Sequence, residues 1–308
     1  MVSSTEPHRQ DPQDPQDPQD RQDLHNMLDW LLPVACDAGH AIMAVYEAAN
    51  THPEGRASAL VQHKADESPL TQADLAAHET IAAGVTKHAP DIVLISEESY
   101  VPEQMAQAVE QGKRFWLVDP LDGTKEFLSG TGEFTVNIAL IENGQSVLGV
   151  VYQPTTDELF WGGKALGAWR RVGNTGSRVS DGTEPMAVAP MSAPPWRVLA
   201  SRSHLGPQTQ ELIGRMGQTT LLQAGSSLKF CRIALGEADF YPRLGFTSQW
   251  DTAAAQAVLE GAGGYVMDLD GKPLRYGQAE IINPHFLASA LPYEQVWQWW
   301  GEGFNFSV

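Results

Sequence analysis

The sequence of 308 residues is poor in cysteine, in basic residues and in long apolar runs. Its two cysteines, Cys36 and Cys231, each lie in an apolar helical pattern. They could pair, but we expect buried, reduced thiols. Lysine and arginine number 20 against 38 aspartates and glutamates, a net charge of −18. This charge argues against binding to duplex nucleic acid, which requires basic side chains, whereas a bound divalent cation would still allow a small anionic substrate.

The sequence also shows no secretory signal, because its first residues are polar and run into acidic repeats. No apolar stretch approaches the ~20 residues that a membrane span requires. We therefore expect a cytoplasmic protein without a transmembrane segment, and peripheral association with the cytoplasmic membrane face is left open. Composition does not distinguish a monomer from a homodimer.

The N-terminal part has two contrasting patterns. From Asp11 the sequence repeats Asp-Pro-Gln, in which the prolines disfavour regular structure and nothing apolar is available for burial, so residues 1–24 are expected to form a disordered tail. Helical apolar spacing predicts a first helix over 28–49 and a second over 71–88. The inner face of the second helix would carry Leu75, His78 and Ile81.

Short β patterns fill the middle of the chain. They are the segments 92–95, 115–118, 134–141, 145–152 and 158–161. The last three predict an antiparallel meander, with Asn143-Gly144 as a hairpin turn. Glycine, serine, threonine and proline dominate residues 173–195, where we expect a boundary.

Beyond this boundary, predicted strands alternate with predicted helices, which is typical of an α/β arrangement. The strands are 198–200, 240–241 and 265–267, and the helices lie near 207–216, 226–236 and 251–262. We therefore expect an N-terminal α+β half over 25–180 that binds metal. A C-terminal α/β half over 181–308 would supply the elements of substrate specificity.

Carboxylates follow two of the early strands. One strand ends at Glu97-Glu98, and the next ends at Asp119-Pro120-Leu121-Asp122-Gly123-Thr124. Carboxylates this close repel one another unless a cation lies between them, and a hard cation with oxygen ligands is the simplest remedy. Two such ions can together promote attack of water on a phosphate ester. Gly123 and Thr124 resemble the start of a helical turn, whose free N–H groups would bind phosphate oxygens.

These carboxylates also resemble parts of ordinary turns and of two other motifs. Each segment alone is also typical of ordinary turns, and Asp251 in Trp250-Asp251-Thr252 could be only a helix N-cap. An EF-hand loop is excluded, because its first, third and twelfth positions would be Val118, Pro120 and Ser129. An aspartyl-phosphate motif fits poorly, because its two aspartates are separated by one residue and those of this segment by two.

Taken together, Glu97-Glu98, residues 119–124 and Trp250–Ala254 resemble the metal-site motifs of the inositol monophosphatase superfamily. The chain resembles most closely its CysQ-type branch, the 3′(2′),5′-bisphosphate nucleotidases, over about residues 28–290. The segments that carry this closer resemblance are Lys64–Asp74, Lys125–Phe127, Gly132–Ile141, Ser201–His204, Gly225–Cys231 and Tyr241–Arg243. The resemblance implies an α/β fold of layered α+β type, an αβαβα sandwich with a mainly antiparallel N-terminal sheet and a smaller C-terminal α/β half.

The resemblance also implies roles for individual residues. The cofactor would be Mg2+, with two or three ions per site. Its ligands would be the side chains of Glu97, Asp119, Asp122 and Asp251 and the backbone oxygen of Leu121. Thr124, paired with Asp74, would orient and deprotonate the attacking water without a covalent intermediate. Asp66 could lie near the cations or only cap a loop.

The second half would select the substrate. By the resemblance, Ser226, Lys229 and Arg243 would contact the part of a nucleotide that does not react, and His204 would lie near its ribose or phosphate. Without the resemblance, Lys229 is typical of a solvated helix residue and Arg243 of a surface ion pair. The remaining substrate contacts would come from Glu97, Leu121, Asp122, Gly123, Thr124 and Asp251.

The leading hypothesis is hydrolysis of the 3′-phosphate of adenosine 3′,5′-bisphosphate, with 3′-phosphoadenosine phosphosulfate as a second substrate, in sulfur assimilation. The partner would be a small nucleotide, not a nucleic acid, and the family would confer sensitivity to lithium. An alternative is an inositol or sugar phosphatase with the same metal site. A non-catalytic nucleotide or metal sensor is a further alternative, against which the complete set of acidic residues argues.

Overall fold

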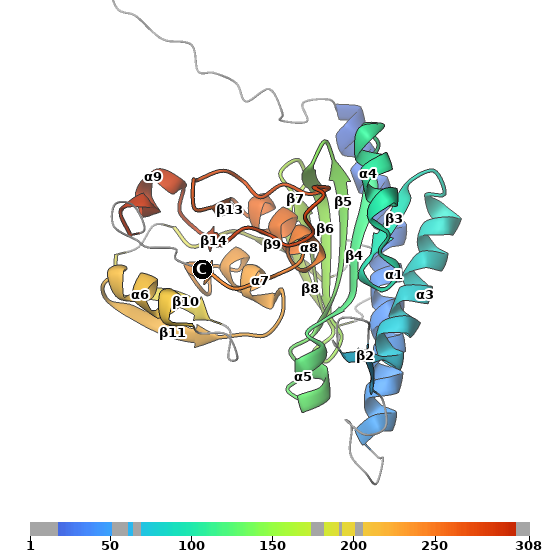
Figure 1. Ribbon diagram of the computed structural model, residues 1–308, viewed down its shortest axis with the longest axis horizontal. Helices are drawn as coiled ribbons and strands as arrows, with labels where there is room; N and C mark the ends of the chain where they lie inside the picture. Colours follow the sequence, from blue (N-terminus) through green and yellow to red (C-terminus); the bar gives the residue numbers. More distant parts are fainter. Residues whose placement is uncertain are drawn as a thin grey trace, which may run out of the picture.

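The computed structural model describes residues 18–50, 61–63, 69–173, 182–190, 193–200 and 206–299. Two residues considered from the sequence, Asp66 and His204, lie outside them. Figure 1 shows successive layers: helices, a large sheet, helices, a small sheet and outer helices. The expected αβαβα arrangement is therefore confirmed.

The large sheet has seven strands in the order β3-β4-β5-β6-β7-β8-β9. Its strands are β3 (Val93–Ser96), β4 (Phe115–Asp122), β5 (Thr135–Glu142), β6 (Gln145–Gln153), β7 (Glu158–Gly163), β8 (Gly167–Val172) and β9 (Thr183–Met186). Only β3 and β4 are parallel, so the sheet is mainly antiparallel as expected. Asn143 and Gly144 connect β5 to β6 with φ of 51° and 75°, the left-handed conformation that this hairpin turn requires. The sequence patterns did not predict β8 and β9.

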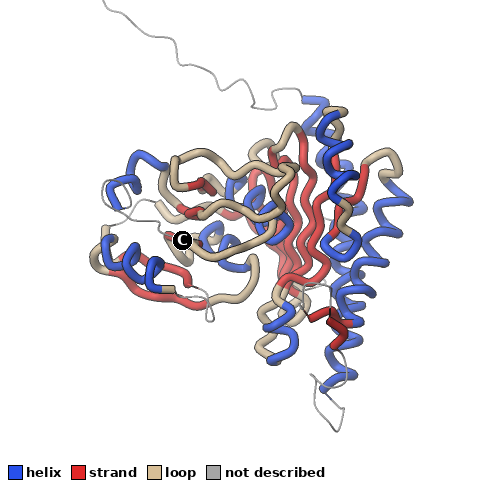
Figure 2. The backbone as a smooth tube through the Cα atoms, in the orientation of Figure 1, coloured by secondary structure: helices blue, strands red, loops and turns tan. Residues whose placement is uncertain are grey.

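Helices α1 (Pro18–Asn50) and α3 (Gln72–His88) cover one face of this sheet, as Figures 1 and 2 show. Trp116 and Val118 of β4 contact them in one apolar core. The helix α1 begins within the segment expected to be tail, because proline is tolerated in a first helical turn and Leu24 is buried. The expected inner face of α3 is wrong at Leu75, which is 39% exposed.

By length and composition alone, α1 is apolar enough to cross a membrane. The expectation that no segment reaches that composition is therefore wrong. Leu28, Leu31 and Leu32 of this helix are nevertheless buried against the sheet and α3. Its apolar residues are thus used in the core of the protein.

The opposite face of the large sheet packs against α7 (Leu228–Ala234) and α8 (Gln249–Gly261). Phe115 and Leu117 point to this side, because side chains alternate along β4. Helix α8 contacts β4, β5, β6, β7 and β8, although it lies late in the sequence. The two parts of the chain therefore share one core.

The small sheet has the order β11-β10-β12-β14-β13. Its strands are β10 (Trp196–Ala200), β11 (Thr219–Gln223), β12 (Phe240–Arg243), β13 (Tyr265–Asp268) and β14 (Phe286–Ser289). Helices α6 (Pro207–Arg215) and α9 (Tyr293–Val296) and the turn η2 (Trp297–Trp299) cover its outer face. Because β9 still pairs with β8, the chain passes from the large sheet to the small sheet after Met186, within residues 173–195.

The remaining elements are short. They are β1 (Val61–His63), which pairs with β2 (Pro69–Thr71), the turn η1 (Glu97–Ser99), and the helices α4 (Pro102–Glu110) and α5 (Thr124–Ser129). Both cysteines are free, as expected, and Cys231 is fully buried, but Cys36 is only partly buried, so the expectation of burial is wrong there.

Candidate metal and phosphate site

A bulge at the end of β4 places Asp119 and Asp122 on the same side of the large sheet. Asp119 pairs with Asn137 and Asp122 with Thr135, so β4 has one residue more than β5 in this interval. Strict alternation would send the two aspartates to opposite faces, and the extra residue restores a common face. Leu121 instead contributes its side chain to the apolar core around α1. The backbone N–H of Leu121 donates to Asp119 Oδ1 at 3.0 Å.

Asp251 reaches the same place from α8. Ser248 is the N-cap of this helix, and Asp251 completes a capping box by accepting from the Ser248 N–H at 2.8 Å. The interpretation of Asp251 as the N-cap itself is therefore wrong. One carboxylate oxygen serves the cap, so the helix start fixes the orientation of this side chain.

Asp119, Asp122 and Asp251 each offer a carboxylate oxygen, and these oxygens lie within 4.8 Å of one another. Burial, followed by repulsion from Glu97 and Asp122, raises the pKa of Asp119 well above its ordinary value. Burial and the charge of Asp122 likewise raise the pKa of Asp251. Because oxygen donors and clustered negative charge suit a hard divalent cation, the three residues fit a metal site.

Asp74 and Glu97 flank this cluster. Asp74 is buried in the first turn of α3, and Glu97 opens η1 directly after β3. Both raise the pKa of Asp119 through their negative charge. His78, one helical turn after Asp74, shares a hydrogen bond of 2.9 Å with Ser96 and so connects α3 to the end of β3.

Gly123 and Thr124 form the expected helical turn. Gly123 has φ of 94°, which favours glycine, and Thr124 is the first residue of α5. The N–H of Phe127 donates to the Gly123 carbonyl at 2.9 Å and closes the first turn. The segment that follows the aspartates therefore presents its N-terminal backbone beside the acidic cluster.

A pocket of about 130 Å3 lies next to the acidic residues. It is lined by Asp122, Gly123, Lys125, Glu126, Ser226, Lys229, Phe230, Tyr241, Arg243, Thr247, Asp251, Thr252 and Phe286. One pocket thus contains acidic groups suited to a cation and basic groups suited to an anion.

Three basic residues line the pocket: Lys125, Lys229 and Arg243. Of these, Lys229 acts on Asp122 and Arg243 on Asp251 through their positive charges. Lys229 is buried, and its Nζ donates to the carbonyls of Ala224 and Ser226 at 3.3 and 2.5 Å. Burial lowers its pKa to about 8, although the charge of Asp122 opposes this change. Arg243 donates to the Phe246 carbonyl at 2.8 Å. Lys229 is thus no solvated helix residue, and the hydrogen bond of Arg243 is with a backbone carbonyl rather than with the acidic partner of a surface ion pair.

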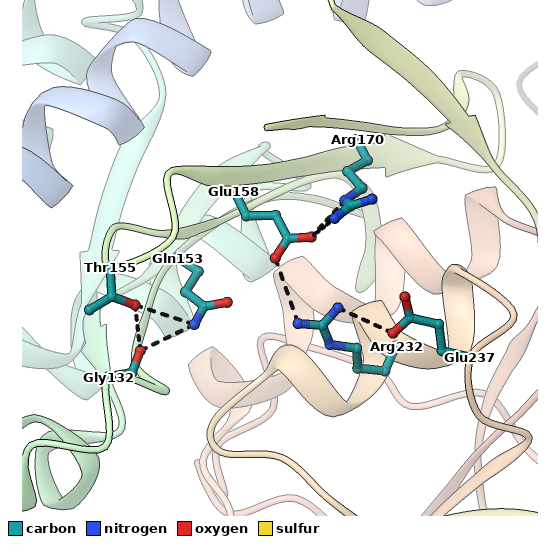
Figure 3. A network of polar contacts seen from close by, with 7 residues as sticks. All are labelled: Gly132, Gln153, Thr155, Glu158, Arg170, Arg232 and Glu237. Atoms are coloured by element: carbon teal, nitrogen blue, oxygen red, sulfur yellow. Dashed lines mark hydrogen bonds and ion pairs between the residues drawn. The ribbon is translucent and has the colours of Figure 1, made fainter. Parts of the chain in front are cut away.

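One ion pair links helix α7, which carries Lys229, to the large sheet. In Figure 3, Glu158 of β7 lies between Arg170 of β8 and Arg232 of α7. The Glu158 carboxylate is 3.6 Å from Arg232 Nη2 and accepts from Arg170 Nε at 2.6 Å. Because Glu158 is buried, these contacts resist movement of α7 away from the sheet.

Sequence reasoning assigned no role to two polar residues near the site, Thr135 and Asn137, and named Ser227 only within the segment Gly225–Cys231. Asn137 Nδ2 donates to Asp122 Oδ2 at 3.3 Å, and the Ser227 N–H donates to the same oxygen at 2.7 Å. Thr135 and Asn137 are polar positions in an otherwise apolar strand, two residues apart, and that pattern could have indicated them.

Comparison with known proteins identifies the family of this fold and site. Residues 23–298 match the inositol monophosphatase family. The chain belongs to this family. The 3′(2′),5′-bisphosphate nucleotidase CysQ of Shigella flexneri is 43% identical over 264 residues, which cover 85% of this chain and 99% of that protein. The Escherichia coli K12 protein of the same name is 41% identical over 266 residues, with the same coverage.

Solved structures agree with this assignment. The crystal structure of CysQ from Bacteroides thetaiotaomicron, a bacterial member of the inositol monophosphatase family, superposes with a TM-score of 0.72 at 36% identity. It covers 86% of this chain and 97% of its own. Membership of the family and the cluster of acidic residues together imply a divalent metal and a phosphatase.

Proposed function

We propose that this protein hydrolyses the 3′-phosphate of adenosine 3′,5′-bisphosphate to give AMP and phosphate, and also accepts 3′-phosphoadenosine phosphosulfate. The supporting observation is the pocket in which Asp122 and Asp251 face Lys229 and Arg243. A substrate with two phosphates suits such a pocket, because one phosphate can lie at the acidic, cation-binding side and the other at the basic side. The names of the relatives support the nucleotide as the substrate.

We propose Mg2+ as the cation, with two or three ions per site. Glu97, Asp119, Asp122 and Asp251 would hold it with their side chains and Leu121 with its carbonyl oxygen. Bound there, the cations would polarise the phosphate ester and offset negative charge on the leaving oxygen. The raised pKa values of Asp119 and Asp251 support this assignment, because such carboxylates gain most from a neighbouring cation.

Asp74 and Thr124 would handle the attacking water. The Thr124 hydroxyl would orient it at the start of α5, and Asp74 would accept its proton. The burial of Asp74 beside the acidic cluster supports this role, because a desolvated carboxylate is a stronger base than one in water. Cys231 is buried in the core between the sheets and is unsuited to act as a nucleophile at this site.

The phosphate that does not react would lie at Ser226, Lys229 and Arg243. The buried ammonium group of Lys229 has few competing interactions with water, so an anion in the pocket would be attracted strongly. Gly123 and Thr124 would contribute contacts to the reacting phosphate, together with the metal-binding side chains. We retain His204 as a proposed substrate contact only on the family resemblance.

A substrate panel tests the proposal. The purified protein would be assayed for phosphate release from adenosine 3′,5′-bisphosphate, inositol 1-phosphate and fructose 1,6-bisphosphate, each with Mg2+ and with EDTA. We expect Mg2+-dependent hydrolysis of the nucleotide to have the highest kcat/KM. Faster turnover of inositol 1-phosphate or the sugar phosphate would assign the alternative function, and binding without turnover of any substrate would indicate a sensor.

A further inference from the structure

A continuous chain of hydrogen bonds joins the turn at Ser226 to the carboxylate of Asp122. Ser226 Oγ lies 3.0 Å from Thr135 Oγ1, and Thr135 Oγ1 lies 2.9 Å from Ser227 Oγ. Ser227 Oγ donates to Asn137 Oδ1 at 2.8 Å, and Asn137 Nδ2 donates to Asp122 Oδ2 at 3.3 Å. The chain therefore crosses from the pocket wall to the acidic cluster through side chains of β5.

The Asp122 carboxylate at one end sets the donor and the acceptor of every hydrogen bond in this series. An ionised Asp122 only accepts, so Asn137 presents its NH2 group to Asp122 and its oxygen to Ser227. Ser227 uses its single proton on that oxygen and must accept from Thr135. Thr135 in turn accepts from Ser226. All donors thus point toward Asp122, an arrangement in which each bond polarises the next.

The backbone of the turn is also pressed against the start of β5. A Cβ atom on Gly225 would lie 2.5 Å from the Glu133 carbonyl oxygen, so only glycine permits this approach. Ser226 has φ of 39°, a conformation that is unfavourable for a serine. The hydrogen bond of its hydroxyl with Thr135 helps to hold this conformation. The placement of Ser226 consequently depends on β5, the strand that pairs with the two aspartates.

We infer that Thr135 and Asn137 are positioning residues that couple the cation at Asp122 to the turn that binds the unreactive phosphate, an inference that rests on the proposed function. A cation that fixes Asp122 also fixes the acceptor at the end of the chain, and this orders Ser227 and Ser226. Binding of the phosphate at Ser226 orders the same chain from its other end. By linkage, each ligand therefore strengthens the binding of the other.

The experiment uses 3′-deoxyadenosine 5′-monophosphate, which lacks both the reacting phosphate and the oxygen that carries it. Its dissociation constant would be measured by calorimetry with and without Mg2+ for the wild type, Thr135→Val and Thr135→Ser. We expect Mg2+ to tighten binding in the wild type and in Thr135→Ser, which keeps the hydroxyl. In Thr135→Val we expect binding with Mg2+ to be about tenfold weaker, as for loss of a hydrogen bond in a charged network, and most of the Mg2+ effect to be lost.

Ser289→Ala is the matched control. Ser289 is fully buried on β14, and its hydroxyl donates to the Leu291 carbonyl away from the chain of hydrogen bonds. The control should retain the wild-type Mg2+ effect. If Thr135→Val does not fold, Ser227→Ala breaks the same chain while keeping the backbone N–H that donates to Asp122.

The outcomes separate this inference from the proposed function. An equal Mg2+ effect in the wild type and in the variant that breaks the chain overturns the inference, as does its loss in Ser289→Ala. A wild type that hydrolyses the bisphosphate but shows no Mg2+ effect on the deoxynucleotide refutes the inference alone. A wild type that binds neither Mg2+ nor nucleotide refutes the proposed function and the inference with it.

Discussion

Replacement of Asp119 by asparagine is expected to stabilise the metal-free protein while it removes metal binding. Asp119 is 2% exposed, and Glu97, Asp122, Asp251 and Asp74 all act on it with the same charge. Asparagine retains an oxygen that can accept from the Leu121 N–H, but it carries no charge. The substitution therefore relieves repulsion without opening a cavity.

The size of the stability gain can be estimated from the neighbouring carboxylate of Asp122. Burial raises the pKa of Asp122 to about 6 from an ordinary value of 3.8, a difference that corresponds to ~3 kcal/mol. The same burial acts on Asp119, so replacement of its carboxylate by a neutral amide should recover roughly 1–3 kcal/mol at neutral pH without metal. At about 2 °C per kcal/mol for a chain of this size, Tm should rise by ~2–6 °C.

The raised pKa values also determine how the stability of the metal-free protein changes with pH. Folded-state pKa values above the unfolded values mean that the folded protein binds more protons, so the metal-free wild type loses stability as pH rises through about 4 to 6. Thermal unfolding in EDTA at pH 5 and pH 7.5 should show this loss, and it should be smaller in Asp119→Asn. Added Mg2+ should raise the Tm of the wild type only.

Asp239→Asn is the matched control, because Asp239 is also a buried aspartate. It accepts from Arg197 Nη2 at 2.6 Å, and the Arg197 side chain is 34% exposed, so loss of this charged hydrogen bond should destabilise the protein by roughly 1–3 kcal/mol. The same substitution thus has opposite effects at the two positions. A lower Tm for Asp119→Asn without metal, or an unchanged response to Mg2+, would refute the reasoning about the cluster.

Three further predictions concern single residues. Because burial lowers the pKa of Lys229 to about 8, its cationic form is lost as pH rises through that value, so the KM for the nucleotide should increase above pH 8 in the wild type and not in Lys229→Met. Asp74→Asn should lower kcat by about 100-fold or more if it removes the general base, while calorimetry shows Mg2+ binding retained. Asp251→Asn should keep the capping box and raise the Tm of the metal-free protein as Asp119→Asn does, whereas Asp251→Ala should be ~1 kcal/mol less stable than Asp251→Asn, and both should weaken metal binding.

Much of the fold was predictable because its patterns are local. Apolar runs bounded by turn residues indicated β3 to β7, and Asn143-Gly144 indicated the hairpin whose left-handed conformation the structure confirms. The start of α1 was predicted too late, because Asp-Pro-Gln repeats are typical of a disordered tail. The burial of Leu24 in the apolar core, which extends the helix, depends on tertiary contacts. Leu75 was assigned to the buried face of α3 but is exposed, because helical spacing does not reveal which face of a helix contacts the sheet.

Local sequence patterns identified the residues able to perform the chemistry: oxygen ligands at strand ends, a glycine turn after them and the order of motifs shared with a family. How these residues come together depends on the tertiary fold. A one-residue bulge turns Asp119 and Asp122 to the same face, and α8 brings Asp251 to them from across the core. Burial makes Lys229 an anion site, and Thr135 and Asn137 connect that site to Asp122. These relations depend on contacts between distant segments, and the local patterns from which a sequence is interpreted carry no record of such contacts.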